Sequence, residues 1–288
     1  MWEQMNPLLS VLPQGVHWVD GYLDSVEEIR FVKGKPIRLR GGKKDRELPI
    51  LVDECILQGI LDRSTERSPH GVMEMLKKGY LILPGGHRLG LCGTGVYKEG
   101  RLSTLREISS INIRIARNVH HFGRSVADTL WKAPGSALCM GPPGRGKTTL
   151  LRDIIWQLST RYGERIAVVD ERLELGASID GCPQFDLGPT IDIMSSVRKP
   201  EAIDMLIRTM GPTWIALDEI TAEEDVEAII RASYCGVRFI ATAHGNGLAD
   251  LRTRPIYRKL LSSNVFRYLF LIDPHRNIHK EELCKCSV

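Results

Sequence analysis

The second half of the chain alternates short apolar runs with stretches in which apolar residues recur at helical spacing. Apolar runs predict buried strands at 136–140, 165–170, 214–217, 237–243 and 268–272. Helical spacing between these runs predicts helices at 150–158, 201–209, 222–234 and 248–261. Alternation of this kind favours a mainly parallel sheet with helices on both faces.

The first half has a different pattern, with shorter runs separated by turn signals. It predicts strands at 29–32, 37–39, 80–83, 87–92 and 108–116, a helix at 53–61 and a second helix that includes Val72, Met73 and Leu76. Turns are expected at Gly93, Gly95 and Gly100. The pattern therefore predicts a smaller α/β domain before the larger one.

In the last strand of this first domain, three isoleucines alternate with Asn112, Arg114 and Ala116. Successive side chains of a strand point to opposite faces, so we expect basic residues on the face away from the core. Arg88, Arg114 and Arg117 then either face a ligand or are solvated, and the pattern does not decide between the two.

The length of 288 residues suits two domains at about 100 to 200 residues each. The segment 118–124 contains two histidines and Gly123 and is the best linker candidate, with Gly123 as a hinge. We therefore expect an N-terminal domain at 1–122 and a second domain at 123–288.

Composition indicates the cellular compartment of the protein and the kinds of partner it can have. No uncharged apolar run approaches the length of about 18 residues that crosses a bilayer. Seven cysteines are scattered singly, which suits a reducing compartment better than a disulfide framework. The net charge of +4 is mild and neither demands nor excludes a nucleic acid or a membrane surface. We expect a cytoplasmic protein.

One stretch carries the clearest chemistry, the phosphate loop Gly141-Pro142-Pro143-Gly144-Arg145-Gly146-Lys147-Thr148, followed by Thr149. Glycines let backbone N–H groups wrap around a polyphosphate, Lys147 supplies a charge for the β and γ phosphates, and Thr148 supplies a hydroxyl for Mg²⁺. A glycine-rich turn that caps a helix is the alternative. Because a strand precedes the loop and a helix follows it, the order favours ATP binding.

Acidic residues follow two of the predicted strands. Asp170, Glu171 and Glu174 come after one strand, and Asp218 and Glu219 come after another. Carboxyl ends of parallel strands meet at one sheet edge, where ligands bind. Asp218 is expected to hold Mg²⁺ with Thr148, and Glu219 to orient or deprotonate the attacking water. Acids that merely favour a helix N-terminus are the alternative.

Two further residues are candidates at this site. His244 follows the strand at 237–243 beside small residues, so it is expected to sense the γ phosphate, although a lone histidine is usually structural. Arg208, near the end of a predicted helix, is a candidate phosphate contact between subunits. A surface salt bridge is the competing interpretation.

The combination of the phosphate loop, Asp170-Glu171-Arg172-x-Glu174, Ala216-Leu217-Asp218-Glu219 and Thr242-Ala243-His244-Gly245-Asn246 resembles the secretion ATPases of type II, type IV and pilus systems. Their acidic box and histidine box fall at corresponding places. Arg172 stands where those ATPases usually have proline, and Asp218 where they often have glycine.

Both departures fit the stage III sporulation protein AA family. The stretches Gly34-Lys35-Pro36, 85–93 and 112–117 also resemble that family's N-terminal domain. The resemblance implies a RecA-like ATPase core behind a smaller α/β domain, assembled as a ring that is expected to be a homohexamer. It further implies a motor docked on membrane proteins of the channel between mother cell and forespore.

Two other functions remain open at this point. One is a nucleic-acid translocase or binding module on the same core, which the mild charge and the 6% aromatic content support poorly. The other is an ATP-gated scaffold that does not hydrolyse, in which Glu219 is structural.

Overall fold

The computed structural model describes residues 8–13, 25–41, 45–65 and 75–283. The chain divides into two compact units, Met1–Arg117 and Asn118–Val288. The expected boundary after Phe122 falls just inside the second unit. Among the described residues, no helix is long and apolar enough to cross a membrane.

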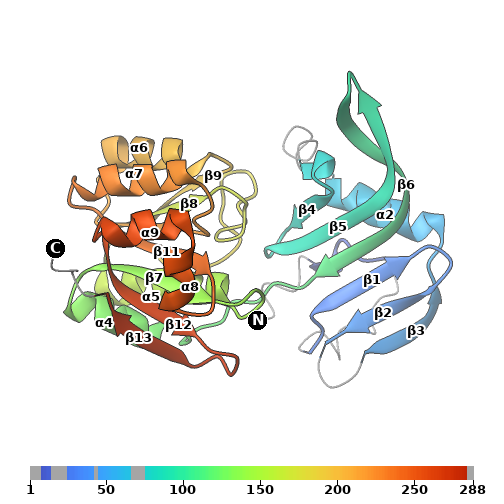
Figure 1. The fold of residues 1–288 in the computed structure, drawn as a ribbon. Coiled ribbons are helices and arrows are strands. Elements are labelled where there is room, and N and C mark those ends of the chain that lie inside the picture. Colours follow the sequence, from blue (N-terminus) through green and yellow to red (C-terminus); the bar gives the residue numbers. More distant parts are fainter. Residues whose placement is uncertain (1–7, 14–24, 42–44, 66–74, 284–288) are drawn as a thin grey trace. The chain divides into compact units, whose positions relative to one another are not determined.

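The first unit is built on an antiparallel sheet with the strand order β3-β2-β1-β6-β5-β4 (Figure 1). Its strands are β1 (Glu28–Val32), β2 (Pro36–Arg40), β3 (Arg46–Leu51), β4 (Tyr80–Leu83), β5 (His87–Lys98) and β6 (Arg101–Arg114). Helix α2 (Glu54–Thr65) packs with the apolar face of this sheet. Of the second expected helix, positions 72 and 73 lie outside the described residues, and residues 75–77 are helical.

The other face of this sheet is basic, as the alternation in 108–116 predicted. Arg40, Glu28, Arg114 and Arg88 are aligned across four neighbouring strands. Glu28 lies 3.3 Å from Arg114 and 3.8 Å from Arg40, so one carboxylate serves two guanidinium groups. Isoleucines 29, 111 and 113 point the opposite way and are fully buried.

Strands β5 and β6 form one long hairpin rather than the short strands expected. Gly93 and Gly95 lie inside β5, and the chain reverses only at Glu99 and Gly100. Both turn residues have positive φ, 50° and 75°, which is the geometry of a type I′ turn that matches the strand twist.

The second unit is built on a sheet with the order β13-β12-β7-β11-β10-β8-β9. Its strands are β7 (Ser136–Gly141), β8 (Ile166–Asp170), β9 (Ile191–Ser195), β10 (Trp214–Leu217), β11 (Arg238–His244), β12 (Phe266–Ile272) and β13 (Ile278–Glu282). All neighbours pair in parallel except β13, which runs antiparallel to β12. The predicted parallel sheet is therefore confirmed.

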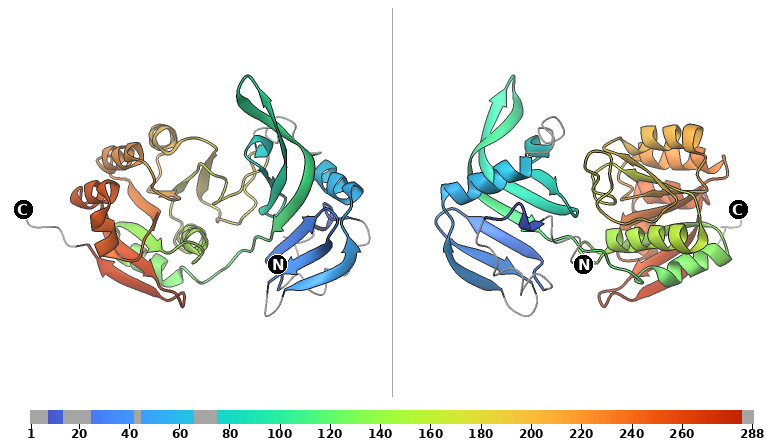
Figure 2. Two further views of the ribbon diagram at one scale, coloured as in Figure 1. Left: turned by 45° about the vertical axis from the view of Figure 1, so that its right-hand side comes forward. Right: turned by 180° about the vertical axis from the view of Figure 1, so that it is seen from behind.

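Helices cover both faces of this sheet (Figure 2). They are α4 (Arg124–Lys132), α5 (Lys147–Tyr162), α6 (Lys199–Met210), α7 (Glu223–Ser233), α8 (Leu248–Thr253) and α9 (Pro255–Ser262). Helices α6 to α9 share a core with alternate residues of the strands, such as Leu138 and Met140 of β7. Helix α5 contacts β7 and β11, and its Leu150, Ile154 and Leu158 are fully buried.

The pattern missed four elements and joined two others. Strands β3, β9 and β13 are edge strands in which no residue is fully buried, so they lack the apolar run that identifies a central strand. Helix α4 begins at Arg124, inside the expected linker. The expected helix at 248–261 is interrupted at Arg254 because Pro255 starts a new helix.

Gly123 is explained by close packing rather than by an unusual backbone angle. Its φ is −94°, which any residue adopts, and its N–H donates to Oδ2 of Asp153. A Cβ atom at Gly123 would lie 2.9 Å from the backbone nitrogen of Ile154. The segment is thus held against α5 at this position.

We therefore predict that Gly123→Ala lowers the free energy of unfolding by about 1–3 kcal/mol, the usual range for overpacking. Gly59→Ala, in the middle of α2, is the control because its new methyl would meet only the side-chain end of Arg63 and no backbone atom. That variant should keep its stability or gain up to about 1 kcal/mol. Urea denaturation followed by circular dichroism measures both, and equal stability of the two variants would contradict the packing argument.

Candidate functional site

The phosphate loop joins the end of β7 to the start of α5, as its residues predicted. Gly144 and Gly146 have φ values of 72° and 89°, and Gly146 immediately precedes the helix. A Cβ atom at Gly141 would lie 3.1 Å from the carbonyl oxygen of Ile272, so β12 requires glycine there. The loop residues Pro143, Gly144 and Arg145 are exposed.

Lys147 lies in the centre of the loop and is only 7% exposed. Its Nζ donates to the carbonyl oxygens of Gly141 and Pro142, at 2.9 and 3.0 Å, and lies 2.8 Å from Nδ1 of His244. Burial lowers the pKa of Lys147, while the charges of Glu219 and Asp218 oppose that shift. The ammonium is therefore a desolvated cation held by neutral acceptors.

His244 reaches Lys147 because β11 pairs with β7 so that His244 is opposite Gly141. The ammonium of Lys147 can only donate, so Nδ1 of His244 must accept, and the ring proton belongs on Nε2. Nε2 lies 3.1 Å from Oε2 of Glu219 and donates to it. Lys147, His244 and Glu219 thus form one hydrogen-bonded chain.

Asp218 follows β10 and is 8% exposed. The hydroxyl of Thr242 on β11 donates to its Oδ1 at 2.9 Å, which fixes the carboxylate. Burial, reinforced by the nearby charge of Glu174, raises the pKa of Asp218 to about 6. Asp218, which follows β10, and Glu174, which follows β8, therefore lie close together.

The loop that follows β8 is organised by Asp170, which is completely buried. Its carboxylate accepts hydrogen bonds from four consecutive backbone N–H groups, those of residues 174 to 177, at 2.7 to 3.2 Å. This arrangement brings Glu174 beside Asp218. Glu171 instead forms an ion pair with Lys199 at the start of α6, with 2.5 Å between Oε2 and Nζ.

Arg152 of α5 is a site residue that the pattern did not single out. Its guanidinium carbon lies 3.9 Å from the centre of the Phe185 ring. Burial lowers the pKa of Arg152 to about 10, and the carboxylates of Asp170, Asp218 and Glu174 oppose that shift. The sequence feature that could have identified Arg152 is its place between the apolar positions 151 and 154 of a buried helix. A charged side chain there needs oppositely charged or hydrogen-bonding partners.

Arg208 is not brought to this site. Helix α6 begins at the site edge, where Lys199 meets Glu171. At about 1.5 Å per residue, Arg208 lies roughly 13 Å further along the helix axis. Its side chain is exposed and has no ion pair with any residue that the structure describes. Thr148 and Thr149, in contrast, are half-buried in the first turn of α5.

The family model for "Sporulation stage III, protein AA" matches residues 12–280. The chain belongs to this family. Stage III sporulation protein AA of Bacillus subtilis (strain 168) is 36% identical over 277 residues, which cover 93% of this chain and 88% of the relative. The expected family is therefore confirmed over both units.

Solved structures identify the fold. The pilus retraction motor PilT, solved with bound ADP, superposes with a TM-score of 0.65 over 93% of this chain and 82% of PilT, at 15% identity. The ATPase DotB of Legionella pneumophila gives 0.57 over 91% and 78% of the two chains, also at 15% identity. The family therefore has the fold of the secretion ATPases, with a RecA-like core behind a smaller α/β unit.

The raised pKa of Asp218 predicts a pH-dependent stability. The folded chain binds this proton more tightly than the unfolded chain, whose ordinary value is 3.8, so folding free energy is lost as the pH rises through about 4 to 6. Asp218→Asn removes that loss. In Mg²⁺-free buffer we expect this variant to gain more in Tm over wild type at about pH 7.5 than at about pH 4.

Asp204→Asn is the matched control, because the Asp204 side chain is 43% exposed. Its Tm difference from wild type should be small at both pH values. A Tm difference for Asp218→Asn that does not change with pH would contradict the cause given for its pKa.

Proposed function

We propose that this chain is an ATP-hydrolysing motor of the secretion-ATPase type. The observation that carries the proposal is the convergence of the phosphate loop, Lys147, Asp218, Glu219 and His244 at one edge of a parallel sheet. These residues lie close to one another because the strands that carry or precede them, β7, β11 and β10, are neighbours in that sheet and pair in a fixed register. A glycine-rich turn that only caps a helix would need none of these partners.

The loop residues bind the polyphosphate. The positive φ angles of Gly144 and Gly146 favour a concave arrangement of backbone N–H groups, and α5 directs its positive N-terminal end at the same point. Lys147 then carries its charge to the β and γ phosphates. Its present acceptors are neutral, so a phosphate oxygen competes for it favourably.

The oxygen groups near the loop fit Mg²⁺. The Thr148 hydroxyl and the Asp218 carboxylate are hard oxygen donors of the kind that Mg²⁺ prefers, and the Thr242 hydroxyl holds Asp218 in place. When bound, Mg²⁺ would neutralise developing negative charge on the phosphates. Glu174 adds a second carboxylate beside Asp218 and is a candidate for the same role, in addition to the residues expected from the sequence.

Glu219 is proposed to orient the attacking water and to accept its proton. Its carboxylate is held by the N–H of His244, which leaves an oxygen for the water. Because His244 also contacts Lys147, it links the phosphate end of the site to the water end. Loss of the Lys147 contact on phosphate binding is how His244 would sense the γ phosphate.

We further propose that the chain works in a ring, as a homohexamer docked at the inner face of the membrane on proteins of a sporulation channel. The descriptions of the family and of the Bacillus subtilis relative support the sporulation part of this proposal. Arg208 keeps its place in the proposal as a phosphate contact between subunits. Glu171, which pairs with Lys199, keeps its proposed place among the acids of the catalytic site. ATP hydrolysis would move the two units about residues 118–122.

Steady-state ATP hydrolysis tests the proposal. Lys147→Ala should abolish nucleotide binding, and Glu219→Gln should keep binding while hydrolysis falls by about 100-fold or more. Specific activity should rise with protein concentration if the ring completes the site. Glu223→Gln, whose side chain is 65% exposed, should behave like wild type.

A wild type that binds ATP but hydrolyses it no faster than Glu219→Gln, even when concentrated, would show that the chain is not a motor by itself. Either a membrane partner is then required for hydrolysis, or the chain is a nucleotide-gated scaffold. Steep salt-dependent binding to DNA would instead revive the translocase.

The two contacts of His244 can be separated by amide substitutions. Asn places an acceptor near the position of Nδ1, whereas Gln places a donor near the position of Nε2. His244→Asn should keep ATP affinity and lose kcat on the order of 10- to 100-fold, as is common when a partner that orients a catalytic group is removed. His244→Gln should keep kcat better and raise KM. If both substitutions left kcat and KM at the wild-type values, the chain of hydrogen bonds would have no part in catalysis.

A further inference from the structure

The loop between β8 and β9, residues 171–190, packs along one stripe of helix α5. Arg152 lies against the ring of Phe185 at 3.9 Å, Nε1 of Trp156 donates to Oδ2 of Asp186 at 2.9 Å, and Ser159 bonds to Thr190. These helix positions are i, i+4 and i+7, so they share one face. We call residues 171–190 the acid loop because it carries Glu171 and Glu174.

The acid loop behaves as one piece between its two ends. Asp170 fixes residues 174–177 through four hydrogen bonds. The N–H of Gln184 then donates to the carbonyl of Gly176 at 2.8 Å, which ties the second half of the loop to the first. Phe185 and Leu187 are buried, so the part of the loop that carries Asp186 is packed rather than solvated.

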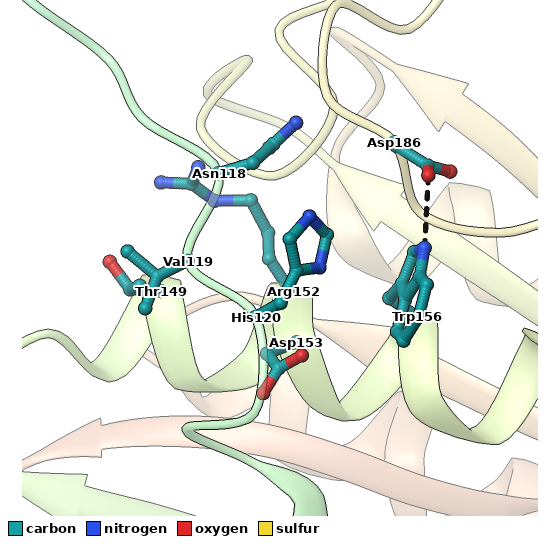
Figure 3. A pocket seen from close by; sticks show the side chains of 8 residues that line it. All are labelled: Asn118, Val119, His120, Thr149, Arg152, Asp153, Trp156 and Asp186. Carbon is teal, nitrogen blue, oxygen red and sulfur yellow. Dashed lines mark hydrogen bonds between the residues drawn. The ribbon is translucent and has the colours of Figure 1, made fainter. Parts of the chain in front are cut away.

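Residues 118–123 begin the second unit and lead into α4, and we call them the entering segment. They lie along the neighbouring stripe of helix α5. The last N–H of the segment, that of Gly123, donates to Asp153, and the ring of His120 lies 4.9 Å from the Trp156 ring, centre to centre. Figure 3 shows Asn118, Val119 and His120 beside Arg152 and Trp156, with Asp186 bonded to the indole. These residues line one small pocket.

Arg152 and Trp156 therefore touch both segments. Arg152 lines the pocket with Asn118 and also packs on Phe185 of the acid loop. The Nε atom of Arg152 is buried and has no hydrogen-bond partner among the described residues, so the guanidinium is not locked at that atom. Trp156 contacts His120 with its ring and Asp186 with its N–H.

We infer that Trp156 and Arg152 couple the acid loop to the entering segment, so that a change of charge at Glu174 and Asp218 repositions residues 118–123. This inference rests on the proposed ATP site, because Mg²⁺ and phosphate are what would change that charge. Trp156 is a positioning residue in this scheme. It passes the movement of Asp186 to His120.

Amide hydrogen exchange of the full-length protein tests the coupling. We compare the protein alone with the protein plus Mg²⁺ and a non-hydrolysable ATP analogue, in peptides that cover 141–149, 183–190 and 118–123. In wild type, exchange rates should change in all of them, by roughly 2- to 30-fold in the entering segment. Trp156→Phe keeps an aromatic ring against His120 but removes the N–H donor to Asp186. It should keep the change at 141–149 and 183–190 and lose it at 118–123.

Asp186→Ala removes the same hydrogen bond from the side of the loop. Agreement between the two variants would show that the lost response does not come from a folding defect of Trp156→Phe. Asp186→Ala should give the same loss in the entering segment. The double variant should be no worse than Asp186→Ala, because the Trp156–Asp186 hydrogen bond is common to both substitutions and Asp186→Ala also removes the acceptor of the Gly188 N–H. Trp131→Phe is the matched control, since Trp131 stacks on Tyr162 outside this pocket. It should respond like wild type.

The outcomes separate this inference from the proposed function. Absence of any change at 141–149 in wild type would mean that the nucleotide does not bind there, and the proposed function fails along with the coupling that rests on it. A change at 141–149 and 183–190 that never reaches 118–123 in wild type would overturn the coupling alone. So would an undiminished response at 118–123 in both Trp156→Phe and Asp186→Ala.

Discussion

The candidate site depends on where one positive charge is held. Lys147 is nearly buried, and a buried ammonium is tolerated only if its protons are satisfied. Two loop carbonyls and one imidazole nitrogen supply the acceptors. Each of these depends on a different part of the fold: the loop on its glycines, and the imidazole on the register of β11 against β7. The rest of the site follows from this requirement, since accepting from Lys147 at Nδ1 leaves the His244 ring proton on Nε2, which faces Glu219.

The carboxylates show how similar residues acquire different roles from their surroundings. Asp170 is saturated by four backbone N–H groups and acts as the anchor of a loop. Asp218 accepts from the Thr242 hydroxyl and the Glu219 N–H, but burial and the nearby acid Glu174 still raise its pKa. Glu171 is compensated by Lys199. A carboxylate whose charged form is disfavoured by its surroundings is the better candidate for a cation ligand. By this criterion Asp218 differs from Asp170 and Glu171.

Much of this arrangement could be predicted from the sequence, and the exceptions have physical causes. Central strands were recognisable because both faces are buried, which makes them continuously apolar. The position of Asp218 and His244 at one edge followed from parallel topology alone. Arg152 and the separate fates of Glu171 and Glu174 could not be foreseen, because they depend on how an irregular loop closes around Asp170. Strands β3, β9 and β13 were missed because pairing, not burial, keeps them in place.

Strand β13 has a further consequence for association. It covers the side of β12 with an antiparallel strand whose residues His279, Lys280, Glu281 and Glu282 are exposed. Charged, solvated edge strands resist the addition of another strand, which is how natural sheets avoid edge-to-edge aggregation. On this side the sheet is closed to extension. Copies of the chain that associate there must do so through side chains rather than by continuing the sheet, which favours contacts that can be released and remade.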